Sequence, residues 1–214
     1  MNIGIIGAGA LGSNIARAFA KAGIPAVISN SRGPESLAEL VKELAPTIKA
    51  GTTEAAAKAD IVVVAIRWAD VKRVLDQLPA WNGRIVVDAT NPVEWIDPDS
   101  PDAKDPTNPL ATYGIKAVDL GGRHSSSVVR EIVHGAHLVK AFNHLDARAL
   151  AEPETSGGRR VLFYSGDDTE AKTTVRALLE KIGFVGVDLG TLDAGGPLTS
   201  LPFGALGGAG FIKI

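Results

Sequence analysis

A glycine pattern close to the N-terminus constrains the fold of this chain more than any other feature. The residues Gly7-Ala8-Gly9-Ala10-Leu11-Gly12 follow an apolar strand candidate, Asn2–Ile6, and open a segment with helical apolar spacing. In that context Gly7 permits a tight turn, Gly9 lets the backbone approach a pyrophosphate, and Gly12 allows close packing of helix and strand. The helix N-terminus offers free N–H groups and a partial positive charge to phosphates. The pattern predicts a dinucleotide-binding unit; the alternative is a glycine-rich turn that binds nothing.

The rest of the chain alternates short apolar runs with segments of helical periodicity, which predicts repeated βα units. Ile61–Ile66 and Arg84–Ala89 are almost continuously apolar, as is typical of strands covered on both faces. We therefore expect an α/β fold: a Rossmann-type, doubly wound, mostly parallel sheet over residues 1–190, with a short apolar C-terminal extension over residues 191–214. The other expected strands are Pro25–Ser29, Thr47–Ala50, Ile115–Leu120, Leu138–Phe142, Arg160–Ser165 and Phe184–Leu189.

Two segments interrupt this alternation. Residues 95–113 contain four prolines and four aspartates, and compact domains rarely hold so long a loop unless it is functional or mobile. The last twenty residues are rich in glycine yet apolar. We expect this tail to pack on the active site or to form a dimer interface.

Composition excludes several classes of function. The 214 residues include no cysteine, so disulfides, thiolate zinc sites, iron–sulfur clusters and cysteine nucleophiles are absent. The net charge of −2 argues against general binding to nucleic acid or to an anionic membrane. Neither a signal peptide nor an apolar run long enough for a membrane helix is evident, so a cytoplasmic protein is expected.

The end of the second expected strand indicates which nicotinamide coenzyme the chain prefers. NAD-specific sites place an acid there, about 20 residues after the glycines, to hold the ribose 2′-hydroxyl. This chain has Asn30, Ser31 and Arg32 instead, and no acid before Glu35. A guanidinium can bind a 2′-phosphate through charge-assisted hydrogen bonds, which favours NADPH. The alternative is a polar turn without a ligand.

Ligands of doubly wound sheets lie beyond the carboxyl ends of the strands. His144 is the histidine best placed there for acid–base chemistry, with Asn143 beside it, although a lone histidine is more often structural. The other histidines, His124, His134 and His137, are expected at the surface or at a helix cap. The residues expected to line the nicotinamide pocket are Ile66, Arg67, Trp68, Thr90, Asn91 and Ala141.

The sequence contains no tyrosine–lysine proton relay and no metal-ligand cluster. Reduction of a ketone needs a proton donor, whereas reduction of a flavin-like ring mainly needs two rings held in position. The chain resembles the NADPH-dependent coenzyme F-420 reductase family in five motifs: the glycine turn, Asn30-Ser31-Arg32, Asp88-Ala89-Thr90-Asn91-Pro92, Val139-Lys140-Ala141-Phe142-Asn143 and Gly196-Pro197-Leu198.

That resemblance implies an oxidoreductase that binds NADP(H) at Gly9, Ala10, Leu11, Ser31 and Arg32. It also implies a deazaflavin, coenzyme F-420, held between Asn143-His144 and the tail, with a flavin as a related acceptor. The proline-rich stretch after Pro92 has no counterpart in that resemblance. Two other functions remain open: an NADPH-dependent reductase of a small imine or keto acid, and a non-catalytic NADPH-sensing module. The apolar, glycine-rich tail also predicts a homodimer.

Overall fold

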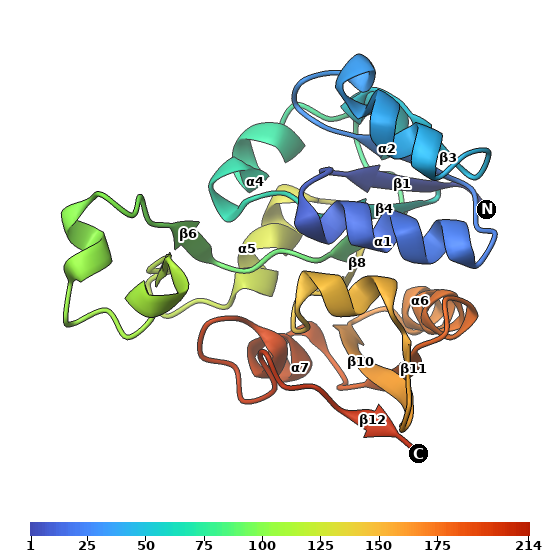
Figure 1. Ribbon diagram of the computed structural model, residues 1–214. Coiled ribbons are helices and arrows are strands. Elements are labelled where there is room, and N and C mark those ends of the chain that lie inside the picture. Colours follow the sequence, from blue (N-terminus) through green and yellow to red (C-terminus); the bar gives the residue numbers. More distant parts are fainter.

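A central sheet divides the protein, whose computed structural model describes residues 1–214 (Figure 1). Its strands lie in the order β11-β10-β8-β5-β4-β1-β2-β3. All neighbours along this path are parallel except β10 and β8, which are antiparallel. The strands of this path are β1 (Ile3–Ile6), β2 (Ala26–Ser29), β3 (Ile48–Ala50), β4 (Ile61–Val64), β5 (Ile85–Asp88), β8 (His137–Ala141), β10 (Gly158–Gly166) and β11 (Val185–Asp188).

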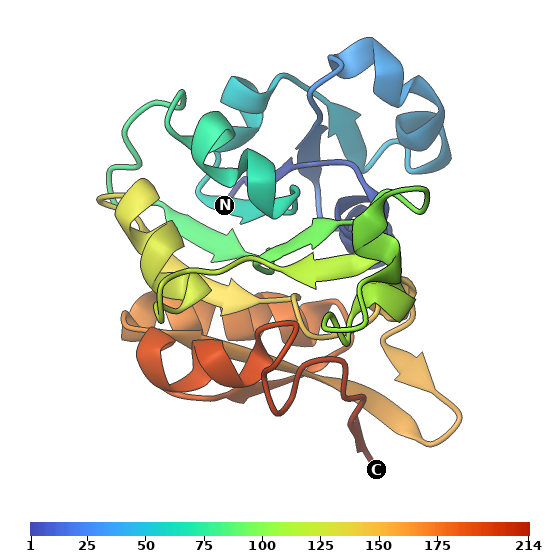
Figure 2. The same cartoon turned by 90° about the vertical axis from the view of Figure 1, so that its left-hand side faces the viewer.

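Helices cover both faces of this sheet, as Figures 1 and 2 show from two sides. The α-helices are α1 (Ala10–Lys21), α2 (Ala38–Glu43), α3 (Thr53–Ala57), α4 (Trp68–Leu75), α5 (Ser125–Ile132), α6 (Thr169–Lys181) and α7 (Leu192–Thr199). Short 3₁₀ turns are η1 (Pro34–Leu37), η2 (Pro101–Lys104), η3 (Ala111–Tyr113) and η4 (Ala147–Ala151). The architecture is a mostly parallel, Rossmann-type α/β fold, as the alternation of apolar runs predicts.

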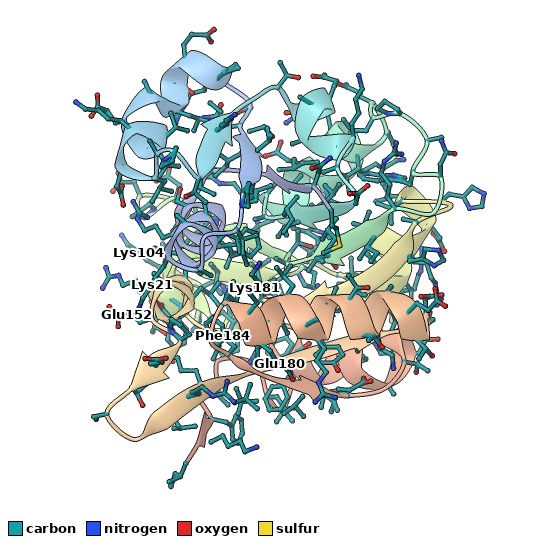
Figure 3. The ribbon with its side chains drawn as sticks, turned by 90° about the vertical axis from the view of Figure 1, so that its right-hand side faces the viewer. Lys21, Lys104, Glu152, Glu180, Lys181 and Phe184 are labelled. Atoms are coloured by element: carbon teal, nitrogen blue, oxygen red, sulfur yellow. The ribbon has the colours of Figure 1, made fainter.

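The central strands are apolar throughout because alternate side chains enter two different cores. On β4, Ile61 and Val63 pack into the core under α1 and α6, while Val62 and Val64 pack into the core under α3, α4 and α5. All four are fully buried. Figure 3 views the molecule from the side on which Phe184 lies buried beside the end of α6. A strand covered on both faces has no solvent side on which a polar residue would be favoured.

Helix ends follow the local sequence closely. Asp168 caps α6 by accepting a hydrogen bond from the Ala171 N–H, and the chain leaves that helix at Gly183 with a positive φ of 96°. Such an N-cap satisfies one of the free N–H groups of the first turn, and glycine tolerates the left-handed exit without strain.

The expected strand Ile115–Leu120 is not part of the main sheet, which is a correction to the sequence-based prediction. Only its first residues form a strand, β7 (Ile115–Ala117), and β7 pairs antiparallel with β6 (Val93–Trp95) in a separate two-stranded sheet. These strands form the base of an arm, residues 93–117, that projects from the body (Figure 1). The proline- and aspartate-rich stretch is the tip of this arm. Apolar periodicity alone could not distinguish an arm strand from a core strand.

The C-terminal segment folds back over the strand β10. Helix α7 packs against β10 and α5, and β12 (Ile212–Lys213) pairs antiparallel with β10, as does β9 (Glu154–Thr155). Gly195 and Gly196 make this packing possible, because a Cβ on Gly196 would meet Ser126 Oγ at 2.5 Å and one on Gly195 would meet Ser165 Cβ at 2.6 Å. None of the helices combines the length and apolar character that crossing a lipid bilayer would require.

Candidate functional site

The turn between β1 and α1 contains three glycines, of which the fold requires two and leaves the third without contacts. A Cβ on Gly7 would lie 2.3 Å from the Ala65 carbonyl oxygen, and a Cβ on Gly12 would lie 2.0 Å from the Gly7 oxygen. A Cβ on Gly9 would meet nothing within 4 Å. Gly9 is therefore not required by contacts within the chain, and the open space beside it suits the close approach of a phosphate.

Helix α1 begins at this open position without any capping side chain and without an acidic residue in its first turn. Its N–H groups and the positive end of its dipole are therefore available to an anion. The glycine turn fits the diphosphate of a dinucleotide both sterically and electrostatically.

A cavity of about 370 Å³ opens over this turn, and we call it the glycine-turn cavity. It lies beyond the carboxyl ends of β1, β2 and β4, where doubly wound sheets bind ligands. Its lining residues are Ile6, Gly7, Ala8, Gly9, Asn30, Ser31, Arg32, Thr53, Ala65, Ile66, Arg67, Asp70, Arg73 and Val74.

The segment after β2 brings a free cation to this cavity. The Arg32 backbone N–H donates to Asn30 Oδ1, and the Asn30 amide donates to Ser36 Oγ, so the turn is held by its own side chains. The exposed Arg32 guanidinium forms no ion pair and no hydrogen bond within the chain. Its donors face a cavity whose adjoining strand end carries no acid, which suits an additional phosphate on a ribose.

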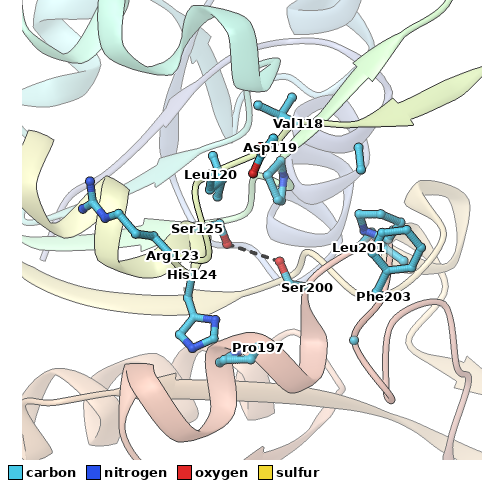
Figure 4. A pocket seen from close by; sticks show the side chains of 14 residues that line it. Val118, Asp119, Leu120, Arg123, His124, Ser125, Pro197, Ser200, Leu201 and Phe203 are labelled. Atoms are coloured by element: carbon cyan, nitrogen blue, oxygen red, sulfur yellow. Dashed lines mark hydrogen bonds between the residues drawn. The ribbon is translucent and has the colours of Figure 1, made fainter.

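A second cavity, of about 500 Å³, lies beyond the end of β5 (Figure 4), and we call it the C-terminal cavity. One wall comes from the segment that links the arm to α5, and the other comes from the end of α7 and the loop after it. The Ser125 and Ser200 hydroxyls bridge the two walls at 3.2 Å. The lining residues are Pro92, Ala117, Val118, Asp119, Leu120, Arg123, His124, Ser125, Pro197, Ser200, Leu201, Pro202, Phe203 and Gly204.

A paired asparagine contact joins the strand ends to the C-terminal segment. The Asn91 amide donates to the Asn143 carbonyl at 2.7 Å, and the Asn143 amide donates to Asn91 Oδ1 at 3.1 Å and to the Thr199 carbonyl at 2.9 Å. Asn91 Oδ1 also accepts from the Leu201 N–H. The preceding residue, Phe142, has a left-handed φ of 68°, which is uncommon for a bulky residue and turns the chain sharply at the end of β8. This contact sets the wall of the C-terminal cavity.

A buried ion pair lies beneath the same strand ends. Lys140 Nζ donates to Asp88 Oδ2 at 2.9 Å and to the Thr90 carbonyl at 2.5 Å, while the Thr90 N–H and hydroxyl donate to Asp88 Oδ1. The side chains of Lys140 and Asp88 are both 0% exposed. The pair fixes the turn that leads from β5 to Asn91 and Pro92.

The predicted acid–base role of His144 is not supported by this geometry. The His144 ring is fully buried against Phe163, with 5.0 Å between the ring centroids, and it lines neither cavity. Burial lowers the pKa of His144 to about 4, so the imidazole is neutral near pH 7. Asn143 is also buried, and its amide is committed to the contacts described above. Both residues contact the C-terminal segment, Asn143 through the Thr199 carbonyl and His144 through its own carbonyl, which accepts from the Gly208 N–H; their catalytic role stays a prediction.

The structure gathers some of the predicted coenzyme-binding residues and separates others. Ala10 and Leu11 open α1, and Trp68 begins α4 and packs partly against the core. Thr90 and Ala141 are buried and line neither cavity, and Asn91 forms the asparagine contact. The predicted residues that line the glycine-turn cavity are Gly7, Gly9, Asn30, Ser31, Arg32, Ile66 and Arg67.

Sequence reasoning missed most of the C-terminal cavity and one side of the glycine-turn cavity. His124, expected only at the surface or at a cap, is the N-cap of α5 and also lines the C-terminal cavity. Asp70 and Arg73 reach the glycine-turn cavity from α4. Their spacing of three residues on a helix that follows a strand end was the only available signal.

The chain is similar in sequence and in structure to several known proteins. Residues 2–92 match the family described as "NADP oxidoreductase coenzyme F420-dependent". The solved structure of protein SMa0349 from Sinorhizobium meliloti, which is described as hypothetical, is 40% identical, covers 100% of this chain and 97% of its own, and has a TM-score of 0.86. A structure from Arthrobacter sp. FB24, whose description proposes an F420-dependent NADP reductase, is 23% identical over 90% of this chain and 86% of its own, with a TM-score of 0.66.

Two longer proteins are similar to this chain over part of their length. The metalloreductase STEAP3 of Rattus norvegicus is 28% identical over 94% of this chain, which spans only 36% of the rat protein. An imine reductase from Aspergillus terreus, solved with NADPH4 and dibenz[c,e]azepine, is 20% identical over 91% of this chain and 56% of its own, with a TM-score of 0.62. Both relatives therefore contain large regions with no counterpart in this chain.

Proposed function

We propose that the chain transfers a hydride between NADPH and a deazaflavin or flavin-type ring, because residues 2–92 match the family of coenzyme F420-dependent NADP oxidoreductases. The observation that carries this proposal is the placement of two cavities at one edge of the sheet. The glycine-turn cavity follows β1, β2 and β4, the C-terminal cavity follows β5, and these four strands are parallel.

The glycine-turn cavity supports the coenzyme part of the proposal. Gly9 leaves room for a diphosphate, the N-terminus of α1 attracts it, and Arg32 offers a guanidinium to a 2′-phosphate. When bound, NADPH supplies the hydride from its nicotinamide ring. The chain's own task is to hold the dinucleotide by its phosphates and to keep the strand-end turns fixed.

The C-terminal cavity supports the acceptor part. Its volume lies within the range of about 300–1,000 Å³ typical of small-molecule sites. Leu120, Pro197 and Phe203 give it apolar walls for a flat ring, and Ser125 and Ser200 place hydroxyls at its back. The Asn91–Asn143 contact holds Leu201 in the wall of this cavity, since Asn91 Oδ1 accepts from the Leu201 N–H. Positioning of two rings is the main requirement of such a reaction.

A panel of acceptors tests the proposal. Purified protein with NADPH is mixed in turn with a deazaflavin, FMN, FAD, a quinone and a cyclic imine, and loss of absorbance at the nicotinamide band is followed. We expect turnover with the deazaflavin or a flavin. Turnover of the imine alone would instead favour the imine or keto-acid reductase. Tight NADPH binding without turnover by any acceptor would favour the sensing module.

The exposed apolar residues of the C-terminal segment support a homodimer as the assembled form. Phe203 is 74% exposed and Ile214 fully exposed, and Leu198, Phe211 and Ile212 are exposed as well. Exposed apolar surface of this kind often marks a contact with another protein. We also propose that the protein is cytoplasmic. Light scattering of Phe203→Asp tests this assignment, since an unchanged dimer mass or a monomeric wild type would contradict it.

A further inference from the structure

The glycine-turn cavity carries more positive charge than the single arginine of the β2 end provides. Three guanidinium groups line it, from Arg32, Arg67 and Arg73, against the one carboxylate of Asp70. A phosphate monoester carries close to two negative charges at pH 7. A coenzyme with a bare 2′-hydroxyl lacks this monoester and presents only its diphosphate to the three guanidinium groups.

Arg73 reaches the cavity from a different element than Arg32 does. Arg32 stands on the loop after β2, and Arg73 stands on α4, with Val74 beside it on the cavity wall. Arg73 forms an ion pair with Asp70, one turn earlier on the same helix. That contact uses one guanidinium nitrogen and orients the group, and the remaining donors form no hydrogen bond within the chain.

We propose that Arg73 is the second half of an arginine clamp on the ribose phosphate of the coenzyme, with Arg32 as the first half and Asp70 as the residue that orients Arg73. This inference rests on the proposed function and adds a specificity-determining residue to it. The physical reason is that two guanidinium groups from two different elements can together match a doubly charged phosphate, whereas a coenzyme without that phosphate offers them no such partner.

The test compares Arg73→Gln with Lys72→Gln. Lys72 is the matched control because it precedes Arg73 on α4, forms a similar ion pair with Asp76, and does not line the cavity. Isothermal titration calorimetry measures the affinity for NADPH, NADH and 2′,5′-ADP, and the last probe contains the ribose phosphate without a nicotinamide. Thermal unfolding of each variant checks that the fold is retained.

We expect Arg73→Gln to weaken NADPH and 2′,5′-ADP by roughly tenfold to a hundredfold, as for loss of a charged hydrogen bond. NADH should change by less than about twofold, and Lys72→Gln should leave all three affinities within about twofold. In the double variant Arg32→Ala/Arg73→Gln, the preference for NADPH over NADH should disappear.

Equal weakening of NADPH and NADH would overturn the clamp, since Arg73 would then act on a part common to both coenzymes. Unchanged NADPH affinity would overturn it too. Either result leaves the proposed function standing if the wild type still binds NADPH. A wild type that binds neither dinucleotide would overturn the proposed function itself, so the two failures are distinguishable.

Discussion

The glycine-turn cavity draws on residues 6–9, 30–32, 53 and 65–74, most of which directly follow a strand of the parallel sheet. The C-terminal cavity draws on residues 92, 117–125 and 197–204, which come from the base of the arm, the N-terminus of α5 and the loop after α7. The first cavity is built largely by a local motif and the second by distant segments brought together. The same glycine-turn motif can therefore bind the coenzyme in different proteins, while the acceptor site varies with the loops that form it.

The buried pair Lys140–Asp88 joins the two regions, because β5 and β8 lie at the boundary between them. We expect Lys140→Met to lower the free energy of unfolding by about 3–5 kcal/mol, since it leaves the Asp88 carboxylate buried without its cation. Urea denaturation measures the loss. The double variant Asp88→Asn/Lys140→Met should recover about half of it, and no recovery would mean that packing rather than charge dominates at this position.

The buried His144, which follows β8, makes the stability of the protein depend on pH. Its pKa in the folded protein is about 4, below the unfolded value of about 6.5, so the unfolded chain binds the proton first as the pH falls. The stabilisation is fully present above about pH 6.5 and is lost as the pH falls toward 4, by roughly 3 kcal/mol in total.

Denaturation curves between pH 4 and 7 measure this effect. His144→Leu should flatten the pH dependence of the unfolding free energy, while His134→Gln, at an exposed histidine, should leave it unchanged. A wild-type stability that is flat across this range would show that His144 is accessible to protons in the folded state, and would reopen its predicted acid–base role.

Replacing Arg32 tests coenzyme binding in the glycine-turn cavity alone. Arg32→Ala should weaken NADPH binding by about 1.5–3 kcal/mol, the usual contribution of a hydrogen bond to a charged group, and should barely affect NADH. Calorimetry with both coenzymes checks this difference. Equal losses for the two coenzymes would contradict the assignment of Arg32 to the 2′-phosphate.

Replacing Gly9 has the smallest expected effect on coenzyme affinity, and Gly12 in the same turn is its contrast. Gly9→Ala should leave thermal stability unchanged, because its Cβ meets nothing, yet weaken NADPH and NADH alike by about 1.4 kcal/mol, or roughly tenfold. Gly12→Ala should instead lower stability by about 1–3 kcal/mol, because its Cβ would collide with the Gly7 carbonyl. If Gly9→Ala bound both coenzymes normally, no phosphate would approach this turn.

Some features of this protein follow from short-range sequence alone. The glycine turn, the two-sided apolar strands such as Ile61–Val64, and the helix α6 with its Asp168 cap each depend on residues adjacent in the chain, so local physical chemistry determines them. The approach of Arg32 to the first cavity also follows, because the ends of neighbouring parallel strands share one edge of the sheet.

Other features were decided only by the tertiary structure. Three examples are the pairing of Ile115–Ala117 with Val93–Trp95, the burial of His144, and the placement of His124 and Phe203 around one cavity. They depend on contacts between segments as far as 79 residues apart in the chain, the separation of His124 and Phe203. A sequence pattern reports which side chains prefer burial and at what period. It does not report which distant segment will cover them, because that choice is made by the packing of the whole chain.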